Sequence, residues 1–566
     1  MKRLFGWGLM ALLLPVGACM AQSRGSESET KPKSGLLTPW DGRAFTRQDS
    51  LRGSITPERA WWDLTYYDLS LSVDPGQKAI SGSNTIGYTV LEPANRMQLD
   101  LQPPLEITGV RQDGKPLAFT REGNVYFITL ESAQQPGTYR EVEVAYGGHP
   151  REAVRAPWDG GFSWKQDSAG LPFVATSCQG LGASAWWPNK DHMYDEVDSM
   201  SMRITVPKPL VDVSNGRLKA VSETDSTSTY HWVVANPINN YGVNVNIGDY
   251  VHFGETYAGE KGPLDVDYYV LRENLDKAKA QFRQVPLMLE AFEHWFGPYP
   301  FYEDSFKLVE APYLGMEHQS SVTYGNGYAN GYRGTDLSGS GWGMKFDYII
   351  IHEAGHEWFA NNITYRDIAD MWIHESFTTY SESLYLDYHF GTEAANAYVI
   401  GLRRNIRNDS PIIGPYNVNQ EGSRDMYFKG ANILHTLRQL VEDDALWRSM
   451  LRGLNQEFYH QTVTTRQIED FLSARSGKDL SAFFDQYLRT AKIPRLEYRR
   501  ANGQLEYRYT QVVPGFDMPV RVFLDGEAHW LFPSAQWKQE ALPENTALMW
   551  DPNFYIQTQA LPPGQP

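Results

Sequence analysis

Cysteine is almost absent from this sequence. Cys19 and Cys178 are the only two in 566 residues, and we expect Cys19 to be capped or removed because it follows a segment with the pattern of an export signal. Cys178 then has no partner within the chain, which excludes an intrachain disulfide in the mature protein. The fold therefore depends on burial of apolar side chains rather than on covalent links.

An excess of positive charge is also missing. The formal net charge is −17, so the protein has no general basic surface, and nucleic acid is not expected as a partner. Beyond the N-terminus no stretch approaches eighteen consecutive apolar residues, and we predict no transmembrane helix in the mature chain. Hydrophobic residues make up 42% of the sequence, which is ample for packed domains, and the length predicts two to four of them.

The N-terminus has the pattern of an export signal. Two basic residues precede an apolar run that ends near Val16, and small residues follow before Cys19, so we interpret residues 1–18 as a signal peptide. The four residues that end at Cys19 resemble the lipobox of bacterial lipoproteins, in which the cysteine is lipidated; cleavage after Ala21 is the alternative. We therefore expect an exported protein, either periplasmic or anchored to the outer membrane through a lipidated Cys19, or else secreted.

Composition and periodicity divide the rest of the chain. Residues 19–40 are polar and small, which predicts a flexible tether. Residues 41–255 contain many short alternating runs punctuated by Gly and Pro, which predicts an antiparallel β sandwich or saddle. Helical periodicity dominates residues 256–490, and alternation returns over residues 491–566 as a small β domain. The predicted fold class is multidomain α+β.

A short motif in the helical region has the pattern of a metal site. Residues 352–356 read HEAGH, an HExxH sequence whose two histidines lie one turn apart on the same face of a helix. A catalytic zinc requires a third protein ligand and one open position. The metzincin class is excluded, because Phe359 and Asn362 occupy the positions of its glycine and histidine. We predict that Glu375, after eighteen intervening residues, is the third ligand.

His352, His356 and Glu375 together predict the chemistry. Two neutral imidazoles and one carboxylate leave a zinc site with net positive charge, which lowers the pKa of a bound water and polarises a substrate carbonyl. Glu353 directly follows the first ligand and is the candidate general base. Glu382 lies seven residues after Glu375 on the same helical face. It either orients a ligand histidine or forms an exposed salt bridge, and both interpretations remain open at this point.

The motif and its surroundings resemble one family. HExxH, eighteen residues and then Glu375 within W-x-x-E-x-F-x-x-Y at residues 372–380 is similar to the gluzincin aminopeptidases of the aminopeptidase N type. The resemblance extends over most of residues 55–495. It implies a zinc metallo-aminopeptidase with one zinc ion per chain. It also implies a saddle-like N-terminal β domain, a thermolysin-like, mainly α catalytic domain and a small C-terminal β sandwich, with Glu382 where the family has a glutamate behind the ligands.

Further motifs add substrate-binding residues by the same resemblance. The stretch Leu314-Gly315-Met316-Glu317-His318 resembles the family's G-x-M-E-N strand, whose glutamate binds the α-amine of the substrate. Tyr427 begins a Y-x-K-G element, whose tyrosine donates a hydrogen bond to the oxyanion of the reaction. Gln179 aligns where the family sets a Gln or Glu beside the amine-binding glutamate. The implied partners are peptides with a free N-terminal amine, and no obligate protein partner is evident.

The sequence departs from the family at two positions near these motifs. His318 and His374 stand where the family usually has Asn; neither removes a ligand or the base, but we expect His318 either to alter the amine pocket or to titrate. The chain also ends before the large C-terminal helical domain of many members, which predicts a more open cleft.

Three functions remain, in order of preference. The first is an aminopeptidase, and the second is a zinc endopeptidase, which is favoured only if the residues that bind the amine fail to do so. The third is a catalytically silent peptide-binding lipoprotein, and the presence of the complete catalytic set argues against it.

Overall fold

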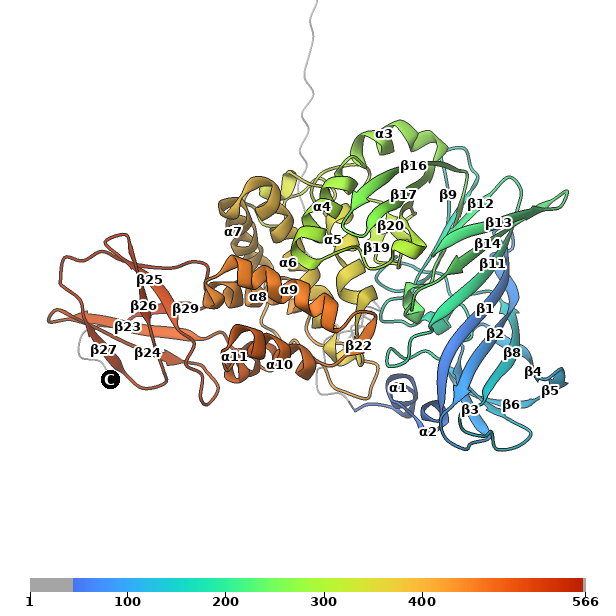
Figure 1. Ribbon diagram of the computed structural model, residues 1–566, viewed down its shortest axis with the longest axis horizontal. Coiled ribbons are helices and arrows are strands. Elements are labelled where there is room, and N and C mark those ends of the chain that lie inside the picture. The colour runs from blue at the N-terminus through green and yellow to red at the C-terminus, as the bar shows by residue number, and fades with distance from the viewer. Residues whose placement is uncertain (1–43, 563–566) are drawn as a thin grey trace, which may run out of the picture. The chain divides into compact units, whose positions relative to one another are not determined.

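The computed structural model describes residues 44–562. Two short helices, α1 (Arg47–Gly53) and α2 (Pro57–Ala60), begin this part of the chain. Mostly strands follow, then mostly helices, then strands again, as Figure 1 shows from blue to red. The predicted α+β organisation is thereby confirmed. The signal peptide predicted for residues 1–18, with Cys19 and the tether over residues 19–40, lies outside the described residues. Among residues 44–562, no helix has both the length and the apolar character needed to cross a bilayer.

The N-terminal region is built around a sheet in the order β13-β14-β11-β1-β2-β8-β4-β5. From Leu69 to Val73, the side chains of β1 are alternately buried and more exposed, which is the origin of the alternation in the sequence. The pairs are antiparallel, as predicted, except that β1 and β11 run parallel, which the long chain segment between them permits. The strands are β1 (Trp62–Asp74), β2 (Ala79–Val90), β4 (Glu106–Gln112), β5 (Lys115–Pro116), β8 (Tyr139–Gly148), β11 (Ser199–Pro207), β13 (Arg217–Glu223) and β14 (Thr227–Val234).

Two smaller sheets belong to the same region, in the orders β12-β15-β10-β9 and β3-β7-β6. β10 ends at Ser177, and the turn that follows it carries Gln179. The short helix η2 (Asn240–Gly242) carries Tyr241. These two connections bring residues of the N-terminal region to the candidate site. The strands are β3 (Arg96–Asp100), β6 (Ala118–Glu122), β7 (Val125–Thr129), β9 (Gly161–Gln166), β10 (Pro172–Ser177), β12 (Val211–Ser214) and β15 (Val245–Gly248).

A further sheet, in the order β16-β17-β18-β20-β19, includes the segment Gly315-Met316 that precedes Glu317. Its edge strand β19 (Gly315–Met316) pairs antiparallel with β20 and with no other described strand. The domain division predicted after residue 255 falls inside β16, which pairs with β17 along its whole length. The other strands are β16 (Tyr250–Gly259), β17 (Gly262–Leu271), β18 (Phe306–Glu310) and β20 (Val322–Tyr324).

Helices form most of the chain between Leu275 and Leu488. Helices α4, α5 and α6 pack on one another, and their apolar side chains belong to one large buried cluster. This packing fixes the helices that carry the HExxH motif and the third predicted ligand. The helices of this region are α3 (Leu275–Gln281), α4 (Gln284–Phe296), α5 (Tyr348–Gly355), α6 (Trp372–Phe390), α7 (Thr392–Gly401), α8 (Phe428–Val441), α9 (Asp444–Glu457), α10 (Thr465–Ser476) and α11 (Ser481–Leu488).

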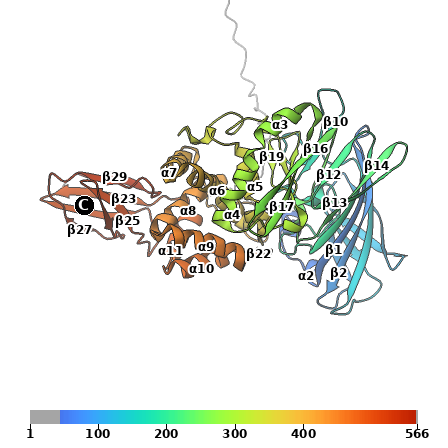
Figure 2. The same cartoon turned by 45° about the horizontal axis from the view of Figure 1, so that its top comes forward.

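The last described residues form two small sheets, in the orders β27-β24-β23-β29 and β26-β25-β28. They are the red elements at the end of the chain in Figures 1 and 2. Buried side chains from both sheets, including Leu496, Tyr507 and Val520, give them an apolar core. The strands are β23 (Arg495–Ala501), β24 (Gln504–Thr510), β25 (Val520–Leu524), β26 (Glu527–Leu531), β27 (Lys538–Ala541), β28 (Leu548–Trp550) and β29 (Gln557–Ala560).

Candidate active site

The HExxH motif lies at the end of helix α5. The helix is capped by Asp347, whose side chain accepts hydrogen bonds from the backbone N–H groups of Ile349 and Ile350, an arrangement that stabilises a helix by about 1 kcal/mol. His352 lies in the last turn and His356 directly follows the helix with a helical backbone conformation. Their ring centroids are 5.1 Å apart. The two imidazoles therefore face the same space, as the i,i+4 spacing predicts.

Helix α6 places Glu375 against this pair. Glu375 Oε2 lies 3.8 Å from His352 Nε2 and 3.5 Å from His356 Nε2. A tetrahedral zinc with bonds of about 2.1 Å holds its ligand atoms about 3.4 Å apart, so the spacing suits that ion. Glu375 Oε2 is buried and accepts no hydrogen bond from any described residue. A buried carboxylate oxygen without a donor requires a cation, and the donor set of two imidazoles and one carboxylate fits zinc.

His352 is held by a buried carboxylate on its other nitrogen. Its Nδ1 lies 2.7 Å from Glu382 Oε1, and Tyr398 donates its hydroxyl to Glu382 Oε2 at 2.6 Å. Glu382 is fully buried, so the exposed salt bridge considered from the sequence does not form. With Nδ1–H donated to Glu382, Nε2 of His352 presents its lone pair to the site.

His356 is oriented by a backbone carbonyl and a hydroxyl group rather than by a carboxylate. After α5 the backbone winds into a wider turn over Glu357–Asn362, within which Phe359 and Ala360 leave helical geometry. This turn sets the Phe359 carbonyl oxygen 3.0 Å from His356 Nδ1, and Thr378 Oγ1 lies at 3.0 Å from the same nitrogen. His356 therefore also directs Nε2 toward Glu375, and nothing in the HExxH pattern indicated either partner.

Glu353 lies beside the edge strand β19. A Cβ atom on Gly315 would lie only 3.0 Å from Glu353 Oε1, and 2.7 Å from Ile349 Cγ2. A glycine at this position therefore leaves the carboxylate room to stand between the strand and the metal ligands. Burial raises the pKa of Glu353 to about 7, although the neighbouring His352 opposes that shift.

Two side chains donate hydrogen bonds to the carboxylate of Glu317, and His374 lies behind one of them. Gln179 Nε2 donates to Glu317 Oε1 at 2.5 Å and to Glu375 Oε1 at 3.1 Å. Tyr241 donates its hydroxyl to Glu317 Oε1 at 3.2 Å and lies 3.3 Å from His374 Nδ1. The Tyr365 backbone N–H donates to His374 Nε2 at 2.9 Å, which places the ring proton of the neutral imidazole on Nδ1.

The result is a directed chain of hydrogen bonds that ends on Glu317. His374 donates to Tyr241, and Tyr241 donates to the carboxylate. Burial holds the pKa of His374 well below its ordinary value, and burial together with Glu317 raises the pKa of Tyr241 well above 10. His374 is thus a neutral donor and Tyr241 a protonated one, and both fix the direction in which Glu317 accepts.

Comparison with known proteins gives the same family as the motifs. The descriptions "Peptidase M1 N-terminal domain" and "Peptidase family M1 domain" match residues 64–241 and 281–487. This chain belongs to peptidase family M1. The second match contains both halves of the metal site, so this M1 chain is a zinc-dependent peptide hydrolase, and the class implied by the resemblance is confirmed.

Individual relatives of this M1 peptidase share little identity with it. Leukotriene A-4 hydrolase of Xenopus laevis is 23% identical over 446 residues, which are 74% of this chain and 68% of the relative. "Probable aminopeptidase 2" of Sulfurisphaera tokodaii is 22% identical over 418 residues, 70% of this chain but 50% of the relative. An M1 zinc metallopeptidase structure from Deinococcus radiodurans superposes with a TM-score of 0.67 at 21% identity, covering 78% of this chain and 98% of that one. That likeness shows a shared fold.

Tyr427 lies beside the ligand histidine His352 in this M1 peptidase. It directly precedes α8, and its ring is nearly parallel to that of His352 with centroids 6.1 Å apart. Its hydroxyl makes no hydrogen bond to any described residue. Burial, with Glu375 nearby, raises the pKa of Tyr427 well above 10. The phenol therefore remains a hydrogen-bond donor that is free to bond a substrate atom.

Of the two expectations for His318, titration is not met. Its ring is fully buried, with Nδ1 3.4 Å from Thr323 Oγ1 and Nε2 without a partner among the described residues. Burial lowers the pKa of His318 to about 3, so it stays neutral at physiological pH and does not titrate there. Cys178 is also buried, with its sulfur 3.6 Å from the Tyr241 carbonyl oxygen. Neither side chain bonds the carboxylate of Glu317.

Proposed function

We propose that the protein is an aminopeptidase, which hydrolyses the first peptide bond of peptides that carry a free N-terminal amine. The observation that supports this proposal is the bridge formed by Gln179 between Glu317 and Glu375. A single amide thus separates the candidate amine-binding carboxylate from a metal ligand. Glu317 is 3% exposed, and a buried carboxylate gains most from a partner that brings a positive charge, such as an α-ammonium group.

The remaining residues have roles that follow from their positions. His352, His356 and Glu375 would hold a zinc ion, which when bound would supply the positive charge that polarises the scissile carbonyl and activates water. Glu353 accepts a proton from the attacking water and transfers it to the leaving amine. Tyr427 donates its hydroxyl to the substrate oxygen as that oxygen gains negative charge.

Glu317 determines which peptide bond is cleaved, so that the released product is a single residue. Its carboxylate binds the α-ammonium, so the carbonyl that reaches the metal ligands belongs to the first residue of the substrate. Gly315 and Met316 continue the same edge strand and offer their backbone to the substrate. The relatives named aminopeptidases agree with this assignment, and the Deinococcus structure carries a Tyr-Ser-Ala substrate according to its description.

The test uses one decapeptide in free and N-acetylated form. We expect the enzyme to remove single residues in sequence from the free peptide and to leave the acetylated peptide almost intact. Glu317→Ala should lose most activity on the free peptide, and the preference for a free amine should shrink. Internal fragments from both peptides, with Glu317→Ala as active as the parent, would establish the endopeptidase alternative instead. Absence of all hydrolysis with zinc bound would establish the silent binding protein.

We propose further that the chain is exported and anchored through a lipid on Cys19. The support is the pattern of residues 1–18 and the lipobox-like segment that ends at Cys19. In a bacterial host, radioactive palmitate should label the parent protein and should not label Cys19→Ser. Equal labelling of both proteins, or labelling of neither, would contradict lipidation at this residue.

A further inference from the structure

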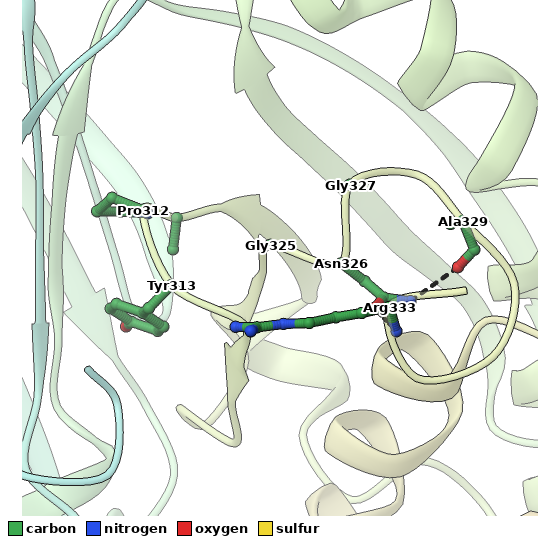
Figure 3. Close-up of a pocket in the computed structure, with 8 residues that line it drawn as sticks. Pro312, Tyr313, Gly325, Asn326, Gly327, Ala329 and Arg333 are labelled. Carbon is green, nitrogen blue, oxygen red and sulfur yellow. Dashed lines mark hydrogen bonds between the residues drawn. The ribbon is translucent and has the colours of Figure 1, made fainter. Parts of the chain in front are cut away.

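A hollow opens next to the edge strand β19. It has a volume of about 420 Å³ and lies between residues 311–313, which lead into β19, and a glycine-rich loop over residues 325–333. Figure 3 shows the side chain of Arg333 extended across the hollow, with its guanidinium group toward Tyr313. The other lining residues are uncharged: Ala311, Pro312, Tyr313, Gly325, Asn326, Gly327 and Ala329.

The guanidinium group of Arg333 has no acidic partner. Within residues 44–562 it forms no hydrogen bond and no ion pair, and it lies over the Trp158 ring, whose centroid is 5.8 Å from Cζ. The chain has 68 acidic and 51 basic residues, so acidic side chains outnumber basic ones. An arginine that faces a hollow with no carboxylate beside it is therefore unexpected from the composition. A guanidinium presents a planar set of donors that matches a carboxylate.

The backbone that carries Arg333 is fixed rather than loose. Arg333 has a positive φ of 50°, and its N–H donates to Asn326 Oδ1 at 2.8 Å. Asn326 in turn donates to the carbonyl oxygens of Ala329 and Gly331 and to Asp347 Oδ1. Asp347 is the residue that caps the zinc-binding helix α5. Asn326 therefore links the loop beside the hollow to the cap of the zinc-binding helix through hydrogen bonds. It also holds Arg333 in a backbone conformation that few non-glycine residues adopt.

The position of the hollow relative to the scissile bond follows from β19. This strand is paired on one side only among the described strands, so an extended peptide can add to its free edge. With its amine at Glu317, the peptide runs antiparallel to the strand, past Gly315 and toward Tyr313. At about 3.3 Å per residue, its third and fourth residues reach the hollow. Both belong to the part of the substrate that leaves after cleavage.

Ring contacts connect the hollow with the metal site. Tyr332 precedes Arg333, and its ring centroid lies 5.3 Å from that of Tyr348. Tyr348 stacks on the metal-ligand candidate His352, with centroids 5.0 Å apart. The loop that carries Arg333 therefore lies against the side of α5 that carries His352.

We propose that Arg333 and this hollow form a carboxylate-binding subsite for the third or fourth residue of the substrate. This inference rests on the proposed aminopeptidase function and names its substrate class. The carboxylate has two possible sources: the C-terminal group of a tri- or tetrapeptide, and an acidic side chain at position 3 or 4 of a longer peptide. The preferred substrates are then short peptides or peptides that are acidic near the N-terminus.

The test compares substrates that differ only in this charge. The first pair is tetra-alanine as the free acid and as the C-terminal amide. The second pair is a decapeptide amide with Glu or Gln at position 4. We expect kcat/KM of the parent enzyme to favour the carboxylate form by about tenfold in at least one pair, as for a partly exposed charge-assisted bond. Arg333→Ala should reduce that ratio to about one, and Arg333→Lys should retain part of it.

Two controls keep the outcome specific. Alanyl-p-nitroanilide is too short to reach Arg333, so Arg333→Ala should hydrolyse it at the parental rate. Arg475→Ala removes an exposed arginine of α10 and should leave every ratio unchanged. Loss of the ratio for tetra-alanine alone assigns the subsite to the C-terminal carboxylate, and loss for the decapeptide alone assigns it to an acidic side chain.

The negative outcomes are also distinct. The subsite is refuted if the anilide is cleaved normally and both ratios are the same in the parent and in Arg333→Ala. If the parent enzyme removes no N-terminal residue from any of these substrates, the aminopeptidase function itself is refuted, and the subsite is refuted with it.

Discussion

Replacing Tyr241 by Phe tests the hydrogen-bond chain behind Glu317. The change removes the hydroxyl that donates to Glu317 Oε1 and that lies 3.3 Å from His374 Nδ1. Glu317 loses a charge-assisted bond, and the buried Nδ1–H of His374 loses its acceptor. Each loss is typically about 1 to 3 kcal/mol, so we expect the free energy of unfolding to fall by about 2 to 6 kcal/mol.

The functional effect of Tyr241→Phe should be concentrated in substrate binding. A carboxylate that is less firmly oriented binds the α-ammonium less well, and we expect KM for a free-amine substrate to rise about tenfold. We expect kcat to change less, because the metal ligands and Glu353 do not bond Tyr241. Steady-state kinetics on an aminoacyl anilide, with zinc content measured on the same samples, separates these effects.

Tyr365→Phe is the matched control for this change. It also removes one phenolic hydroxyl and keeps the ring, which lies 4.2 Å from the His374 ring, but that hydroxyl has no hydrogen bond to any described residue. A double-mutant cycle of Tyr241→Phe with His374→Asn should show coupling, because the two residues share one bond. An unchanged KM in Tyr241→Phe, or the same KM change in Tyr365→Phe, would refute the role assigned to the chain of hydrogen bonds.

Three further changes test the metal side of the site. Glu353→Gln should keep zinc near one per chain but lower kcat at least a hundredfold, since Gln cannot accept a proton; an active variant would refute the general-base assignment. Glu382→Gln should weaken zinc affinity by about 10- to 100-fold in a chelator competition titration, because His352 Nδ1 loses its carboxylate acceptor; parental affinity would contradict this reasoning. Gly315→Ala should lower kcat about tenfold with zinc retained, because its Cβ would displace Glu353; normal kcat would show that the strand gives way instead.

Much of the metal site could be predicted because its residues are close in sequence. The spacing within residues 352–356 follows from helical periodicity, and Glu375 follows because α5 and α6 are neighbours in the chain and in space. The alternation from Leu69 to Val73 likewise predicts a half-buried strand without knowledge of its partner.

The rest depends on contacts between distant parts of the chain. Tyr241 reaches Glu317 across 76 residues of sequence, and no local pattern marks it. The Phe359 carbonyl oxygen bonds His356 only because the helix widens after residue 356. The parallel pair of β1 and β11 depends on which strands meet after the intervening chain has folded. Such features are set by tertiary packing, which periodicity does not report.

The bond from Gln179 to Glu375 also bears on how this protein can be divided. A fragment cut to residues 281–487 would keep the complete HExxH helix and its third ligand, but it would leave out both Gln179 and Tyr241. Glu317 and Glu375 would lose the donors that lie between them and beside them. The recognition of an amino terminus is therefore not a module that can be transplanted with the catalytic helices, and any engineered minimal enzyme must carry the turn after β10 with it.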